Sequence, residues 1–340
     1  MQVVHSPLHA RHDGGVELHR GELVPMYESP DRIDHILRAV QAAGMPVIEP
    51  REFGFEVLHA VHDPAFVEFL RTAYPRWQAE GRGGSMLPSG FPARSLRRDR
   101  VPEGINGMMG YYAFDAGTPI VAGTWDAAFA AARCALTAAA LVSEGARAAY
   151  ALCRPPGHHA ARSVYGGYCY LNNAALAAQA LRDAGCARVA VLDIDYHHGN
   201  GTQDIFWWRE DVFFASLHGT PETEYPYFLG FADERGAGEG EGRTLNLPLP
   251  RGTQWPAYEG ALDVALRAID TFGADALVVS LGVDTFEGDP ISSFALDASH
   301  FVAIGERMAA LRLPTVLVQE GGYAVEEIGA NVGAVLAAFA

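Results

Sequence analysis

Runs of apolar residues divide the chain into predicted strands. The runs are short, rich in β-branched residues and largely free of polar alternation, which is typical of strands buried on both faces of a parallel sheet. We predict strands at residues 2–4, 148–153, 189–192, 212–218, 275–281 and 315–319. Most of these runs end abruptly in polar residues or glycine, so the pattern also indicates where each strand stops.

Apolar residues at helical spacing lie between the strands, behind start signals such as Ser29-Pro30 and Asp63-Pro64. We predict helices at residues 30–44, from 64 to a break at Pro75, and then at 124–145, 172–185, 258–271, 297–311 and from 325 onward. Strands that alternate with helices predict an α/β fold, with a mostly parallel central sheet covered by helices on both faces.

Three segments show neither pattern and are expected to be loops, at residues 5–28, 81–110 and 219–242. The second is long and carries scattered apolar residues, which favours a surface that docks on something, such as a second subunit. Packing of this loop on its own domain is the alternative. No linker, low-complexity tract or internal repeat divides the chain, so residues 1–340 are expected to form one catalytic domain with an insertion at 81–110.

Composition excludes several classes of function. A formal net charge of −16 argues against non-specific nucleic-acid binding and favours cationic ligands. The N-terminus lacks a signal-peptide pattern, and the best membrane candidate, 127–142, is alanine-rich and contains Arg133, so no membrane association is expected. The four cysteines form no CxxC pair or disulfide framework, which fits a reducing cytoplasm.

The stretch RVAVLDIDYHHGNGTQ, residues 188–203, carries the strongest chemical signal. Asp193, Asp195 and His197 follow the buried strand at alternate positions, so their side chains share one face of an extended backbone. Ligands bind at the carboxyl ends of strands in open α/β sheets. Two carboxylates buried there without a cation would be costly. The stretch therefore predicts a metal site.

Other strand ends add polar groups to the same edge of the sheet: the pair His158-His159, then Asp284 and Tyr323. Asp195, His197 and Asp284 make a three-ligand set that leaves positions for water and substrate, which is typical of a catalytic metal site. Zinc is the expected ion, and Fe(II) or Co(II) would also suit this donor set.

Four motifs, RPPGHHA, DIDYHHGNGTQDIF, SLGVDTFEGDP and EGGYAVEEIG, resemble those of the histone deacetylase superfamily. The resemblance is strongest to its acetylpolyamine amidohydrolase branch and runs over essentially the whole chain. It implies the arginase–deacetylase α/β fold and the hydrolysis of an N-acetyl amide. It also implies that Zn²⁺ at Asp195, His197 and Asp284 polarises the amide carbonyl and the attacking water.

The resemblance assigns roles to five further residues. His158 and His159 flank the water, one acting as general base and then as acid toward the leaving amine. Tyr323 donates a hydrogen bond to the developing oxyanion, Asp193 orients His158, and Asn200 is the partner of His159. Many deacetylases have aspartate in place of Asn200. A neutral partner stabilises an imidazolium less, so His159 should be less basic here.

The resemblance further implies monovalent cations. A potassium ion near the active site is expected on the backbone of Asp193, Asp195, His197 and Leu217 together with Ser216 Oγ. A second monovalent site is expected on the backbone carbonyls of Phe206, Arg209, Val212 and Arg243.

The expected substrate is a small acetylated amine, such as an acetylated diamine or polyamine. Its channel is expected to be lined by Glu17, Tyr168, Tyr225 and Ile291, although the tyrosines could instead be ordinary aromatic packing. The 81–110 loop matches the insertion that the polyamine branch uses to form a homodimer with a narrow active-site mouth. Arginines are also present in this loop, at Arg94, Arg97, Arg98 and Arg100.

Three other functions remain open. A protein acetyl-lysine deacetylase is the main alternative, although no acidic loop residue that would grip a peptide backbone can be placed before Gly110. A binuclear ureohydrolase on the same fold would need two further carboxylates, at positions occupied here by Gly199 and Gly282. A catalytically silent protein that binds acetylated amines is the third.

Overall fold

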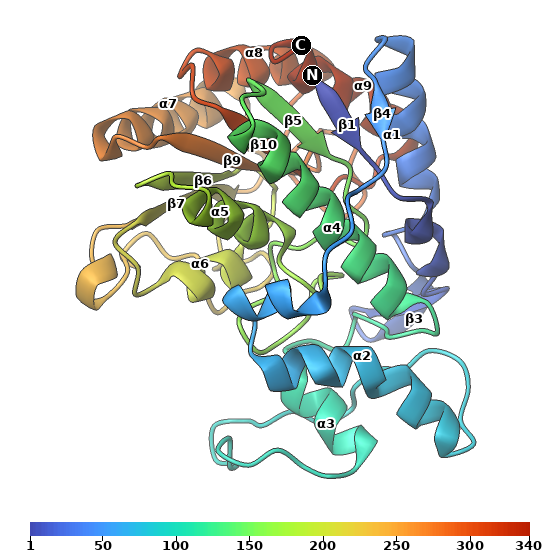
Figure 1. Ribbon diagram of the computed structural model, residues 1–340. Coiled ribbons are helices and arrows are strands. Elements are labelled where there is room, and N and C mark those ends of the chain that lie inside the picture. Colours follow the sequence, from blue (N-terminus) through green and yellow to red (C-terminus); the bar gives the residue numbers. More distant parts are fainter.

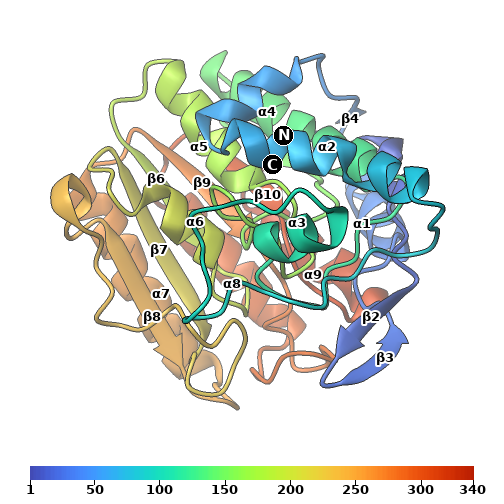
Figure 2. The ribbon, with the colours of Figure 1, turned by 90° about the horizontal axis from the view of Figure 1, so that it is seen from below.

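The centre of the protein is an eight-stranded sheet in which every pair of neighbouring strands runs parallel (Figures 1 and 2). The computed structural model describes residues 1–340. In spatial order the strands are β4 (Val47–Ile48), β1 (Gln2–Val4), β5 (Ala148–Ala151), β10 (Thr315–Gln319), β9 (Ala276–Leu281), β6 (Val189–Asp193), β7 (Val212–Gly219) and β8 (Thr244–Leu249). The predicted parallel sheet is confirmed, and β4 and β8 extend it at its two edges.

Helices cover both faces of this sheet, as the alternation of elements predicted (Figure 1). One face packs against α4 (Thr124–Ser143) and α5 (Asn173–Asp183), and the other against α1 (Asp31–Ala42), α7 (Trp255–Phe272), α8 (Ala298–Ala309) and α9 (Val325–Ala337). Along β6, Val189 and Val191 enter the first core, whereas Ala190 and Leu192 enter the second. Burial on both faces explains why this strand is apolar without alternation.

The remaining helices lie outside these two layers. α2 (Pro64–Ala79) packs against α3 (Ile105–Tyr112), and α6 (Asn200–Phe206) follows the metal-ligand stretch. The expected break at Pro75 was wrong, because α2 continues through it to Ala79. Buried side chains earlier in α2, among them Phe66 and Phe69, anchor the helix. We infer that this packing outweighs the backbone hydrogen bond lost at the proline.

Two predicted loops contain regular structure. Residues 5–28 include an antiparallel hairpin, β2 (Val16–His19) and β3 (Glu22–Pro25), and the end of 81–110 forms the start of α3. The hairpin reverses the usual alternation, since Glu17 is buried while Leu18 and Leu23 are exposed. The sequence of the hairpin therefore lacks the alternation of apolar and polar residues that would predict two strands.

α4 is the one helix long and apolar enough to cross a membrane, and 67% of its apolar window is buried inside the fold. A buried core helix of a soluble protein can have the same length and hydropathy, so these properties of α4 are weak evidence for a membrane span. Because all eight strands of the main sheet are parallel, their carboxyl ends lie along one edge, and the polar residues that follow β5, β6, β9 and β10 meet there.

Candidate metal and catalytic site

Asp195, His197 and Asp284 come together at this edge. Their ligand atoms all lie within 4.8 Å of one another, and all three side chains are largely buried. His197 Nδ1 is 3.0 Å from Asp284 Oδ2 and 3.4 Å from Asp195 Oδ1. Two carboxylates and one imidazole facing one point make a donor set suited to zinc or a similar divalent ion.

Backbone groups hold the two carboxylates in this arrangement. Gly321 N–H donates to Asp195 Oδ2 at 2.8 Å, and Tyr196 N–H donates to Asp284 Oδ1 at 2.8 Å. Burial, and then the charge of Asp195, raise the pKa of Asp284 to about 8. A divalent cation would offset the repulsion between these carboxylates, so the residues present fit a metal ion.

The structure leaves no room for the carboxylates of a second metal. A Cβ atom at Gly282 would lie 2.2 Å from Asp195 Oδ2, and one at Gly199 would lie 2.1 Å from Asp193 Oδ2. Real Cβ atoms essentially never approach so closely. A side chain at either position that a binuclear ureohydrolase would need would therefore force Asp193 or Asp195 out of its present arrangement.

The paired histidines lie beside the metal cluster, each fixed by a partner on its Nδ1. His158 Nδ1 lies 3.0 Å from Asp193 Oδ2, and His159 Nδ1 lies 2.7 Å from Asn200 Oδ1. Although burial disfavours its charged form, the carboxylates of Asp195 and Asp193 raise the pKa of His158 to about 10. Burial, and then the charge of His158, lower the pKa of His159 well below its usual value. The two imidazoles thus favour opposite protonation states.

Tyr323 faces the same space from the loop after β10. Its backbone N–H donates to Asp289 Oδ2 at 2.7 Å, and burial raises the pKa of its hydroxyl well above the usual value, so the hydroxyl keeps its proton. Arg32 lies over its ring, with Cζ 4.9 Å from the ring centroid. Arg32 also donates to the carbonyls of Gly322 and Glu320, each at 2.6 Å, which ties the Tyr323 loop to α1.

A buried carboxylate joins the Tyr323 loop to the loop that carries the paired histidines. Glu28 Oε1 accepts from Arg32 Nη1 and from Arg154 Nε, both at 2.8 Å, and all three side chains are fully buried. Arg154 also donates to the carbonyl of His9 at 2.7 Å. No local pattern in the sequence indicates this network, because Arg154 lies 126 residues from Glu28.

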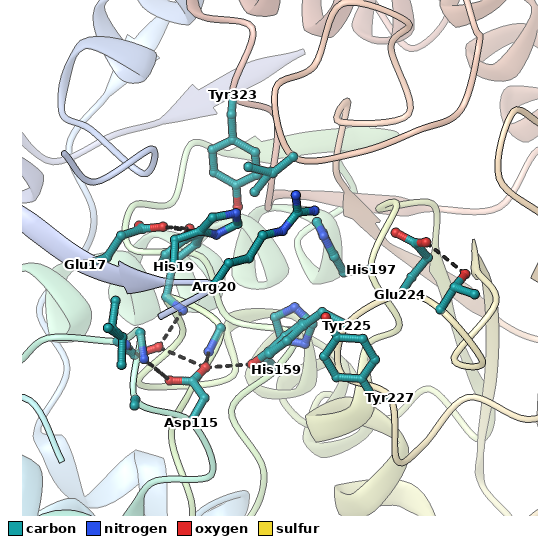
Figure 3. A pocket seen from close by; sticks show the side chains of 18 of the residues that line it. Glu17, His19, Arg20, Asp115, His159, His197, Glu224, Tyr225, Tyr227 and Tyr323 are labelled. Carbon is teal, nitrogen blue, oxygen red and sulfur yellow. Dashed lines mark hydrogen bonds and ion pairs between the residues drawn. The ribbon is translucent and has the colours of Figure 1, made fainter. Parts of the chain in front are cut away.

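The cluster opens into a cavity of about 310 Å³ (Figure 3). His159, His197 and Tyr323 line it from the inner end. The four residues predicted to line a substrate channel are also in its wall: Glu17, Tyr168, Tyr225 and Ile291. Their contact with substrate stays a prediction. The loop arginines Arg94, Arg97, Arg98 and Arg100 are not among the residues that line the cavity of the single chain.

Residues that the sequence did not single out complete the cavity wall. The β2–β3 hairpin contributes Leu18, His19 and Arg20, and Arg251 lies in the turn after β8. The hairpin was missed because its strands lack apolar alternation. Arg251 was missed because β8 was not predicted, so nothing indicated that the turn after it reaches this edge.

A second group of possible ligands, His158, Cys169 and Glu320, also has its ligand atoms within 4.8 Å of one another. Burial raises the pKa of the Cys169 thiol well above its usual value, so it is not a thiolate and is a poor metal ligand. Glu320 Oε2 accepts from the backbone N–H groups of Gly157 and His158, at 2.6 and 3.1 Å. This group holds the histidine loop in place.

The residues expected to bind the first monovalent cation lie at the carboxyl end of β6 and in the adjacent part of β7. Ser216 on β7 is paired in register with Asp193 on β6, and its Oγ lies 2.8 Å from His218 Nδ1. At the second expected position, the carbonyls of Phe206 and Arg243 each accept one backbone hydrogen bond, at 3.0 and 2.9 Å. Cation binding at both positions stays a prediction.

Comparison with known proteins identifies the family. The pattern described as "Histone deacetylase domain" matches residues 26–339 of this chain.

The chain belongs to the histone deacetylase family.

Curated members of this family are similar along their whole length. "Acetylpolyamine amidohydrolase 1" of Pseudomonas aeruginosa is 53% identical over 338 residues, which cover 99% of this chain and 98% of that protein. "Acetylpolyamine amidohydrolase" of Mycoplana ramosa is 49% identical over 337 residues, 99% of this chain and 98% of that protein. The crystal structure of acetylpolyamine aminohydrolase from Burkholderia pseudomallei superposes with a TM-score of 0.95 at 44% identity, covering 100% of this chain and 98% of that one. The predicted arginase–deacetylase fold of histone deacetylase family members is confirmed.

Proposed function

We propose that this histone deacetylase family member is a metal-dependent amidohydrolase that removes the acetyl group from small acetylated amines of the acetylpolyamine class. The products would be the free amine and acetate. One observation carries the proposal: His159, His197 and Tyr323 line a single cavity. Directly behind them lie the other two metal-ligand residues, next to His197, and His158, next to His159. The names and full-length similarity of the relatives support the choice of substrate over an acetylated protein.

Asp195, His197 and Asp284 would hold the metal, with zinc first and Fe²⁺ or Co²⁺ as alternatives. When bound, the ion would supply Lewis acidity at the amide carbonyl and lower the pKa of a water molecule. The absence of room for side chains at Gly199 and Gly282 supports one ion per chain.

The histidines would move the protons. His159 is held neutral, so its Nε2 can accept a proton from the attacking water. His158 favours its charged form and can pass a proton to the leaving nitrogen. Asp193 and Asn200 fix the two rings through Nδ1 and so direct each Nε2 away from these partners. We therefore assign His159 as the main base and His158 as the acid.

Tyr323 would stabilise the oxygen that becomes negative as water adds to the amide carbonyl. Its hydroxyl stays protonated and lines the cavity beside His159 and His197. Arg32 stacks on its ring, which limits its motion. A donor of this kind acts mainly in the transition state.

Monovalent cations and a second subunit complete the proposal. Potassium would bind the backbone carbonyls of Asp193, Asp195, His197 and Leu217 together with Ser216 Oγ, and would stiffen the carboxyl ends of β6 and β7. A second monovalent ion would bind near Phe206. The insertion at 81–110 would form a homodimer that narrows the mouth of a single catalytic domain. Two apolar side chains of that loop support a subunit contact, because they are exposed in the single chain: Leu96 is 58% exposed and Val101 is 37% exposed.

We further propose a cytoplasmic location, because the four cysteines form no disulfide framework.

The test is a panel of kcat/KM values for acetylputrescine, acetylcadaverine, acetylspermidine, acetyl-lysine and an acetyl-lysine peptide, at one ionic strength. The small amines are expected to be the better substrates. A peptide preferred by more than about tenfold, which is about 1.4 kcal/mol of transition-state binding, would replace this proposal with a protein deacetylase.

A further inference from the structure

The tip of the β2–β3 hairpin holds an arginine in an unusual backbone conformation. The turn consists of Arg20 and Gly21, with φ angles of 51° and 89°. Two-residue turns of this kind are normally built from glycine, asparagine or aspartate, because other residues are strained at positive φ. Strain of this kind at a site is a reason to look for a function of the residue that bears it.

Arg20 is placed to meet a ligand. It lines the same cavity as His159, His197 and Tyr323 (Figure 3), and it forms no ion pair and no side-chain hydrogen bond. The other arginine of the wall, Arg251, differs because its guanidinium lies 3.2 Å from a carboxylate oxygen of Glu224.

The carboxylates of the wall each have at least one partner already. Asp115 accepts hydrogen bonds from the backbone of Gly117, Thr118 and Gly167 and from the hydroxyls of Thr118 and Tyr225. Glu17 accepts from the Tyr168 hydroxyl at 2.8 Å through Oε1, while its Oε2 has no hydrogen-bond partner.

The charge of Glu17 is also reduced. Burial raises the pKa of Glu17 to about 7, so near neutral pH it carries only part of a negative charge. With Asp115 and Glu224 engaged as well, the unpaired guanidinium of Arg20 is the group of the wall best able to take a new charged partner.

We propose that Arg20 binds a carboxylate at the outer end of the substrate, so that this site deacetylates acetamido acids in addition to simple acetylated amines. A guanidinium and a carboxylate pair through two parallel hydrogen bonds, whereas an ammonium can form no such pair with Arg20. The substrates this predicts are N-acetylated ω-amino acids, and also Nε-acetyl-lysine as the free amino acid. The inference rests on the proposed deacetylase function and refines its substrate class.

The test uses two substrates that share one tether. N-acetylcadaverine and 6-acetamidohexanoate have the same acetamide and the same pentamethylene chain, and they end in an ammonium and a carboxylate. The metal-loaded full-length protein is compared with Arg20→Gln, which removes the charge, Arg20→Glu, which reverses it, and Arg20→Lys, which keeps it without the planar fork.

Arg312→Gln is the matched control. Arg312 is also an exposed arginine at positive φ, 58°, and forms no ion pair, but it precedes β10 and so lies toward the opposite edge of the sheet from the site. It reports the effect of one lost charge on the molecule as a whole. Arg20→Gly adds a stability measurement, since relief of the strained turn should raise the midpoint of thermal unfolding.

We expect wild-type protein to hydrolyse both substrates. Arg20→Gln should lower kcat/KM for 6-acetamidohexanoate by about tenfold or more, mainly through KM, while N-acetylcadaverine changes by less than about threefold. Arg20→Glu should shift the ratio further toward N-acetylcadaverine, Arg20→Lys should fall between wild type and Arg20→Gln, and Arg312→Gln should leave the ratio unchanged.

Three results would overturn the proposal. Wild type could hydrolyse the amine but not the acid, or the Arg20 variants could alter both substrates equally. Alternatively, Arg20→Glu could dissociate a dimer without changing the ratio, which would assign Arg20 to a subunit contact. Failure of wild type on every acetylated substrate is a different outcome, because it rejects the deacetylase function itself.

Discussion

Replacing Glu28 by glutamine should destabilise the protein and slow its catalysis, because one buried carboxylate oxygen of Glu28 binds two arginines. Glu28 Oε1 accepts from Arg32 and Arg154 at 2.8 Å each, and none of the three side chains is exposed. Glutamine keeps the shape and one acceptor but removes the only negative charge shared by both guanidiniums. Glu28 Oε2 has no hydrogen-bond partner, so the new amide group meets no acceptor there.

The size of the effect follows from burial. Removing one partner of a buried ion pair typically costs about 3–5 kcal/mol, because a charge stays buried without compensation. That is a large share of a typical unfolding free energy of about 5–15 kcal/mol. We therefore expect Glu28→Gln to lower the free energy of unfolding by about 3–5 kcal/mol. Arg32 also holds the Tyr323 loop, so kcat should fall by about tenfold or more, with a smaller change in KM.

Denaturant unfolding measures the first effect, and steady-state kinetics on an acetylated amine measures the second. Glu144→Gln is the control, because Glu144 pairs with Arg51 through two bonds of 2.5 and 2.7 Å but the side chains are 56% and 45% exposed. An exposed pair should contribute less than about 1 kcal/mol. If Glu28→Gln costs no more than Glu144→Gln, the reasoning about the buried network is refuted.

The same network predicts a pH dependence. Against the effect of its burial, Arg154 and Arg32 lower the pKa of Glu28 below the usual value. A lowered folded-state pKa gives stability that is present above the unfolded value of about 4.3 and is lost as the pH falls through the folded-state pKa. The difference in unfolding free energy between wild type and Glu28→Gln should therefore be constant near neutral pH and shrink below about pH 4.

Three further predictions concern the site. Tyr323→Phe should lower kcat by about 10²–10³ with substrate affinity largely kept, and a nearly unchanged kcat would mean that Tyr323 only packs. Asn200→Asp should raise the pKa of His159, because a charged partner stabilises the imidazolium, and so move the acidic limb of the kcat/KM profile to higher pH; an unmoved limb would exclude His159 as the base. Replacing the exposed residues 93–103 by a short Gly-Ser link, which retains α3, should give monomers with altered substrate selection, and a deletion variant that stays dimeric would contradict the role of the loop.

The sequence predicted the sheet and the metal cluster because both are local patterns. β6 is apolar on both faces, and Asp195 and His197 follow it within one short stretch. Asp284 and Tyr323 could be assigned to the same predicted site because the carboxyl ends of parallel strands share one edge of the sheet. The motif resemblance then gave the partners of His158 and His159, and the structure has Asp193 and Asn200 at hydrogen-bonding distance from them.

Other features depend on contacts that no local pattern reveals. Glu28 is 126 residues from Arg154, and Arg32 is 290 residues from the carbonyl of Gly322 that it binds. Arg20 and Glu17 enter the cavity through a hairpin whose apolar side chains face outward, the reverse of the usual strand signal. These residues became visible only when the fold brought distant segments together.

The proposed chemistry depends above all on one catalytic metal ion held by Asp195, His197 and Asp284. Protein stripped of metal by a chelator should be titrated with Zn²⁺ while hydrolysis of acetylcadaverine is followed, with Asp284→Ala treated in the same way. Activity is expected to be absent without metal, to rise linearly with added Zn²⁺ and to reach a plateau at one ion per chain. Asp284→Ala is expected to bind zinc weakly and to stay inactive. Full activity in stripped protein, or a plateau only at two ions per chain, would contradict the proposed chemistry.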